Sequence, residues 1–111
     1  MFLYRVVRGD PPTTADFRSH EARGRPLPPG ANEQTRRLWS GISVYDTEER
    51  ARQAALDYPR LGAYIAMLEV REEDPVRAER TTASLGHHTL WGEPAVLLGR
   101  TLAVKAMVEL G

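Results

Sequence analysis

The sequence predicts a single α+β domain over residues 1–111, with a small, twisted, split β-sheet of five to six strands and two to three short helices. Short runs of alternating or continuous apolar residues recur along the chain, as strands require. Helix-capping residues and Pro- or Gly-containing turns separate these runs. A chain of 111 residues is long enough to bury one modest core without metals or disulfides.

The first third of the chain predicts one strand followed by a short helix and a loop. Residues Phe2–Val7 are rich in aromatic and β-branched side chains and predict a strand that ends at the turn GDPP over residues 9–12. A short helix is expected over Asp16–Ala22. The segment Gly24–Gly30 holds three prolines and two glycines and predicts a loop.

The run LWSGISVYDTEERARQAA over residues 38–55 predicts a strand that leads directly into a polar helix. Ile42 and Val44 alternate with Ser43 and Tyr45, so one face of the strand is apolar and the other carries hydroxyl groups. Asp46 or Thr47 then caps the helix, and Asp46 with Glu49 resembles a capping box. A strand end with hydroxyl groups beside free helix N–H groups is a place to hold a polar ligand.

The remaining elements follow from the same signals. Residues 32–37 predict a brief helical turn that begins at Asn32, and AYIAMLEV over 63–70 predicts the central strand. Short strands are expected over 76–81 and 87–91, a helical turn at Pro94, and a last strand over 101–110 with one apolar face.

Charge and composition exclude several function classes. The chain has 15 basic and 15 acidic residues, and a general nucleic-acid or membrane-surface binder should show a basic excess. A local basic patch remains open, formed by Arg18, Arg23, Arg25, Arg36 and Arg37. The absence of cysteine excludes disulfides and thiolate chemistry. The N-terminus does not read as a signal peptide, and no apolar run approaches the ~20 residues that span a bilayer, so we expect a cytoplasmic protein without membrane contact.

Three polar features stand out as candidate site residues. Arg5 lies within the apolar first strand, where it either faces solvent or grips a phosphate or carboxylate at a cleft. Ser43 and Tyr45 share a strand face, which is either an exposed polar edge or a place where Ser43 bonds a ligand and Tyr45 stacks on a flat ring.

The segment GHHTLWG over residues 86–92 is the densest cluster of chemically capable side chains. Neighbouring strand residues point to opposite faces, so His87 and His88 are not expected to share a metal, and we predict no metal site. One of the two histidines is expected to face a cleft and to bond a ligand or transfer a proton. The carboxylates of Glu69, Glu79 and Glu109 are candidates for an acid, a base or a group that stabilises an oxocarbenium ion.

The order of these elements resembles the compact ADP-ribosyltransferase-like fold of tRNA 2′-phosphotransferases and RES-type NAD-degrading toxins. The resemblance rests on LYRVV, SVYDTEERARQA, AYIAMLEV and GHHTLWGEP, taken in that order. It implies that NAD is the substrate, that ADP-ribose is transferred to a protein or RNA acceptor or NAD is hydrolysed, and that the protein is a stand-alone bacterial enzyme or toxin.

The resemblance also implies a set of site residues. Arg5 would match the first-strand contact with NAD, while Ser43, Tyr45 and Thr47 would match the strand-to-helix segment that lines the nicotinamide pocket. His88 or Thr89 would occupy the late strand, with His88 in a catalytic role and Thr89 in cofactor binding. The acidic catalytic residue would be Glu79 or Glu109. The first-strand histidine of the phosphotransferases is absent here.

Two other functions are compatible with the sequence. One is a non-catalytic protein-interaction module of a bacterial cytosolic system, which predicts no effect of NAD and an exposed apolar or arginine-rich surface. The other is an RNA- or DNA-binding domain that uses the arginine patch with Trp39 and binds in a strongly salt-dependent way.

Overall fold

A computed structural model describes residues 1–82 and 84–107. It is an α+β fold with six strands, three α-helices and two short 3-10 helices in these residues. In chain order the elements are β1 (Phe2–Val7), η1 (Thr14–Phe17), α1 (Glu33–Trp39), β2 (Ile42–Tyr45), α2 (Glu48–Asp57), η2 (Pro59–Leu61), β3 (Tyr64–Glu69), β4 (Arg77–Glu79), β5 (His87–Trp91), α3 (Pro94–Gly99) and β6 (Thr101–Ala106).

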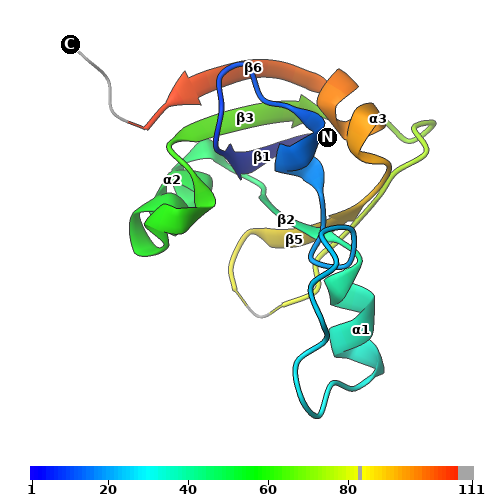
Figure 1. Ribbon diagram of the computed structural model, residues 1–111. Coiled ribbons are helices and arrows are strands. Elements are labelled where there is room, and N and C mark those ends of the chain that lie inside the picture. Colours follow the sequence, from blue (N-terminus) through cyan, green and yellow to red (C-terminus); the bar gives the residue numbers. More distant parts are fainter. Residues whose placement is uncertain (83, 108–111) are drawn as a thin grey trace.

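The sheet is antiparallel, with the strand order β4-β5-β2-β1-β3-β6. It consists of two three-stranded halves, β4-β5-β2 and β1-β3-β6, and the pairing between the halves is shorter than the pairing within them. β1 pairs with β3 along its whole length, from Phe2 opposite Glu69 to Val7 opposite Tyr64. The pairing of β1 with β2 is recorded at one register position, Tyr4 opposite Tyr45. Figure 1 shows β6, β3 and β1 together, and β2 with β5 apart from them. The predicted α+β fold with a split sheet is therefore confirmed.

Alternation along the strands builds an apolar core on each face of the sheet. The larger core is covered by η1 and α3 and has Phe17 and Leu97 among its buried side chains. The smaller core lies under α2, whose Ala51 and Ala55 pack on Val6 and Ile65. Small alanine side chains let the helix approach the sheet closely.

The helix starts follow local capping chemistry. The Asn32 side chain accepts a hydrogen bond of 2.9 Å from the Thr35 N–H and begins α1, as the sequence predicted. Thr47 begins α2 by accepting a 3.2 Å hydrogen bond from the Arg50 N–H. The expected capping box of Asp46 and Glu49 is wrong, because the Asp46 carboxylate instead pairs with the Arg50 guanidinium.

Two predicted elements differ from the structure. The helix expected over 16–22 is wrong: the 3-10 turn η1 ends at Phe17, and a separate turn covers residues 20–24. The Asp16 carboxylate accepts hydrogen bonds from the backbone N–H groups of Arg8 and Thr13 and so ties this segment to the end of β1. The last strand ends at Ala106, and Leu102 on it is exposed. Residues 108–110 of that predicted strand lie outside the described residues. Within 1–82 and 84–107, no helix has the length and apolar character needed to cross a membrane.

Candidate functional site

The Arg5 guanidinium lies where β1 and β2 separate. Its Nε atom donates to the Asp16 carbonyl oxygen at 3.1 Å, and its Nη1 atom donates to the Ser43 carbonyl oxygen at 2.9 Å. Arg5 thus links η1 on one side to β2 on the other. These two bonds use two of its five N–H donors, and the other donors can bind a ligand. The side chain is half-buried, not directed freely into solvent.

A cavity of about 920 Å³ opens at this separation. Its walls come from β1, β2 and β5, from the segment after η1, from α1, and from the end of α2 with η2. A volume of this size falls within the range of small-molecule and cofactor sites. The pocket therefore combines both halves of the sheet with three further segments of the chain.

Ser43 and His87 meet across the pairing of β2 with β5. The Nε2 atom of His87 lies 3.0 Å from the Ser43 hydroxyl oxygen, and its Nδ1 atom lies 3.0 Å from the Thr82 hydroxyl oxygen. The Tyr45 ring packs edge-on against the imidazole, with the ring centroids 5.5 Å apart. Both imidazole nitrogens are held by hydroxyl groups, so the ring has a fixed orientation at the pocket wall.

Burial shifts the pKa values of these groups. Burial, and then the neighbouring His88, lower the pKa of His87, which favours the neutral imidazole. Burial also raises the pKa of Tyr45 and keeps its hydroxyl protonated. Burial, and then the charge of Arg23, lower the pKa of Arg5 to about 10, so Arg5 is still a cation at neutral pH.

The pocket is strongly cationic although the chain as a whole is neutral. Within the described chain, Asp57 is the only acidic residue that lines it. Six of the 14 arginines line it: Arg5, Arg8, Arg18, Arg23, Arg25 and Arg60. Low-dielectric walls focus the field of such a cluster. The pocket is therefore suited to an anionic ligand.

An aromatic stack forms another wall of the pocket. The His20 imidazole stacks on the Trp39 indole with a centroid distance of 4.3 Å and an interplanar angle of 26°. Trp39 Nε1 donates to the Arg25 carbonyl oxygen at 3.0 Å, which fixes the indole. Burial, and then Arg25, lower the pKa of His20. Flat aromatic surfaces of this kind accept the π-face of a heterocyclic base.

The structure brings together four of the residues expected at the site, since Arg5, Ser43, Tyr45 and Thr89 all line the pocket. His87 lines it too, whereas His88 lies opposite the core residue Val44 and does not. Alternation predicted that only one of the two histidines would face a cleft, and the cross-strand register determines that it is His87.

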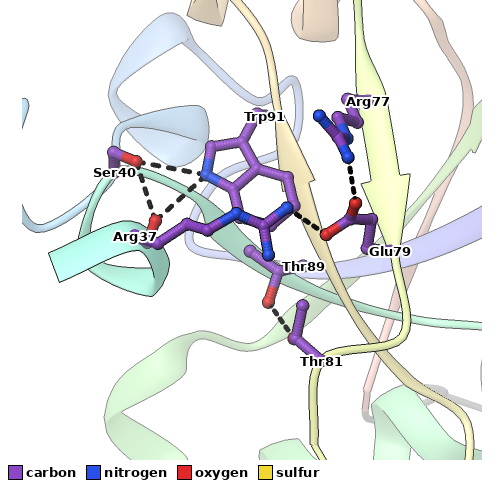
Figure 2. A network of polar contacts seen from close by, with 7 residues as sticks. All are labelled: Arg37, Ser40, Arg77, Glu79, Thr81, Thr89 and Trp91. Atoms are coloured by element: carbon purple, nitrogen blue, oxygen red, sulfur yellow. Dashed lines mark hydrogen bonds and ion pairs between the residues drawn. The ribbon is translucent and has the colours of Figure 1, made fainter. Parts of the chain in front are cut away.

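The other expected site residues lie elsewhere. Thr47 is the N-cap of α2 and does not line the pocket. Figure 2 shows Glu79 between the side chains of Arg37 and Arg77, with the Arg37 guanidinium over the Trp91 ring. Glu79 too is absent from the pocket lining. The hydrogen bond from Arg37, and the one from Arg77, lower the pKa of Glu79. Glu109 lies outside the described residues.

The Thr89 side chain is buried beside the pocket and exchanges a hydrogen bond with the Thr81 hydroxyl, as Figure 2 also shows. Gly41 lets the strands approach here, since a Cβ atom at this position would lie 2.4 Å from Thr89 Cγ2. No group of three or more potential metal ligands is present in residues 1–82 and 84–107.

Comparisons with protein-family models, with curated proteins and with solved structures found no match to this chain.

Proposed function

We propose that this pocket binds NAD and that the protein transfers ADP-ribose from NAD to a protein or RNA acceptor, or hydrolyses NAD. The observation that carries the proposal is the convergence of Arg5, Ser43, Tyr45 and Thr89 on one cationic pocket. Those four residues come from three strands, and the family resemblance alone named them as NAD contacts. The proposed location is the cytoplasm, where NAD is available.

The chemistry of NAD matches the types of group in the pocket. Guanidinium groups bind phosphate oxygens in a planar, bidentate fashion, which suits the diphosphate. Tyr45 offers a ring against which nicotinamide can pack, and the stack of His20 on Trp39 offers a surface for adenine. The Ser43 hydroxyl, which already bonds His87, is suited to a ribose hydroxyl.

The proposed reaction breaks the bond between the ribose C1′ atom and the nicotinamide nitrogen, and the electron pair leaves with nicotinamide. The oxygen of water or of an acceptor forms the new bond to C1′ and loses a proton. We assign His87 to take that proton at Nε2, which would exchange its hydrogen bond with Ser43 for one from the attacking oxygen, and the lowered pKa of His87 favours the neutral imidazole that a base requires. Only groups that stabilise the transition state more than bound NAD accelerate this step.

The test is nicotinamide release from NAD, measured by chromatography for the wild type and two alanine variants. His87→Ala should reduce the rate by a factor of about 100 or more, in the range of general base catalysis. His88→Ala is the matched control, since it changes the adjacent residue of β5, which does not line the pocket. Equal rates for the two variants would contradict the role of His87, and absence of release by the wild type would contradict catalysis.

A single-stranded nucleic acid is the second candidate ligand, and the stack of His20 on Trp39 among arginines favours it. A base stacked on such a platform contributes about 1–3 kcal/mol, and phosphate contacts make binding fall steeply with salt. A labelled oligonucleotide titrated at 50 and 200 mM salt distinguishes the two ligands. The protein-interaction module is the remaining alternative, and it predicts that neither NAD nor an oligonucleotide binds.

A further inference from the structure

Ion pairing divides the arginines of this protein into two groups. Six arginines outside the pocket form ion pairs with carboxylates: Arg37, Arg50, Arg52, Arg71, Arg77 and Arg100. No ion pair is recorded, among the described residues, for any of the six that line the pocket. The carboxylates in these ion pairs, those of Asp46, Glu48, Glu69, Asp74 and Glu79, all lie outside the pocket lining, so the pocket keeps an excess of positive charge.

Three other pocket arginines act on the charge of Arg23. Burial, and then the charges of Arg8 and Arg25, lower the pKa of Arg23, while the Asp16 carboxylate opposes this effect and Arg18 adds to it. Its Nη2 atom donates to the Ala15 carbonyl oxygen at 3.1 Å, which holds the guanidinium against η1. Like charges gathered in this way are unfavourable in the empty protein and become favourable when an anion binds between them.

The positive charge of the six pocket arginines exceeds the negative charge of the NAD diphosphate. Each phosphate of that group carries a single negative charge, and the pyridinium ring of NAD is positive. A phosphomonoester carries about −1.5 to −2 at pH 7 and offers three strong acceptor oxygens. Several guanidinium groups can bind those oxygens at the same time.

We infer that the cluster of Arg8, Arg18, Arg23 and Arg25 is a phosphomonoester subsite, so that the preferred dinucleotide is one that bears an additional phosphate, as NADP does. This inference rests on the proposed function for the dinucleotide, whereas the phosphate subsite itself stands on the arginine cluster alone. Arg8 directly follows β1 and the other three arginines follow η1, whereas Ser43 and His87 belong to β2 and β5.

The experiment compares NADP, NAD and inorganic phosphate by isothermal titration calorimetry at constant ionic strength. Wild-type protein should bind NADP at least about tenfold more tightly than NAD. Arg23→Ala should remove that preference, so that the affinity for NADP falls at least about tenfold more than the affinity for NAD. Arg80→Ala is the matched control, because Arg80 is exposed and is not among the pocket-lining residues. If Arg23→Ala does not fold, Arg18→Ala replaces it.

The outcomes separate the two proposals. Equal affinities of the wild type for NADP and NAD would overturn the subsite and leave the proposed function in place. Phosphate binding that Arg23→Ala abolishes and Arg80→Ala retains, without binding of either dinucleotide, would support the subsite and overturn the proposed function. Absence of binding of all three compounds would overturn both.

Discussion

The imidazole of His87 and the hydroxyl of Ser43 face one another across β5 and β2, with 3.0 Å between Nε2 and Oγ. Their meeting follows from the antiparallel register, in which Tyr45 lies opposite His87 and Ser43 opposite Thr89. Side chains of directly and diagonally opposed residues on one face are within reach of each other. A shift of one residue would bring His88 to the pocket in place of His87.

Stability should fall in mildly acidic solution because of the pocket histidines. Burial is the main reason that the folded pKa of His87 and that of His20 lie below the unfolded value of 6.5. The unfolded chain therefore binds more protons, so this contribution is present above pH 6.5 and is lost as the pH falls through the folded pKa values. Urea unfolding at pH 8, 7, 6 and 5 should show the decline, with a smaller loss for His87→Gln than for the wild type. Equal losses would contradict this account.

Asp16 should be needed for stability. Its buried carboxylate accepts a 2.8 Å hydrogen bond from the Arg8 N–H and a 2.9 Å hydrogen bond from the Thr13 N–H. Asp16→Ala removes both hydrogen bonds, and a hydrogen bond to a charged group contributes about 1.5–3 kcal/mol to stability. Asp16→Asn keeps one acceptor oxygen and should have an intermediate free energy of unfolding. A free energy of Asp16→Ala within 0.5 kcal/mol of the wild type, the range of an ordinary surface change, would contradict the role of this carboxylate.

Thr47 should contribute to stability and not to ligand binding. Its hydroxyl caps α2 at Arg50, and loss of a threonine cap costs about 0.5–2 kcal/mol. Thr47→Ala should lower the denaturation midpoint, Thr47→Ser should restore it, and both variants should bind NAD as the wild type does. Weaker NAD binding by both folded variants would return Thr47 to the ligand contacts that the resemblance implied.

Gly62 should tolerate no side chain. Its φ of +147° disfavours other residues, and an added Cβ atom would lie 2.1 Å from the Val7 carbonyl oxygen at the end of β1. Gly62→Ala should destabilise the fold by about 1–3 kcal/mol or more. Gly99→Ala is the control, since no atom lies within 4 Å of its added Cβ. Equal denaturation midpoints for the two variants would show that β1 yields at this point.

The strands were predictable because their signals are local. The alternation of Ile42 and Val44 with Ser43 and Tyr45, and the apolar run of β3, depend only on neighbours in sequence. The helix expected over 16–22 was wrong, and this segment is held by a tertiary contact that no local pattern contains. The Asp16 carboxylate bonds the N–H of Arg8, eight residues earlier.

The site was predictable only in part because it depends on long-range placement. Arg5, Ser43 and Tyr45 each stood out as polar residues within or beside an apolar strand. The choice of His87 over His88 needs the register of β5 against β2, which no local pattern contains. The approach of Arg60, after α2, to Arg8, after β1, likewise needs the folded chain, in which Arg8 Nη2 donates to the Arg60 carbonyl oxygen at 3.1 Å.

The most direct test of the central claim is a calorimetric titration of the native protein with NAD, repeated with Arg5→Ala and with the control Arg80→Ala. We expect saturable binding to one site by the native protein and by Arg80→Ala, and loss of binding by folded Arg5→Ala. At 100 times the dissociation constant, NAD should also add about 2.7 kcal/mol to the stability of the native protein. No binding of NAD by the native protein at millimolar concentration would contradict the claim that this pocket is an NAD site.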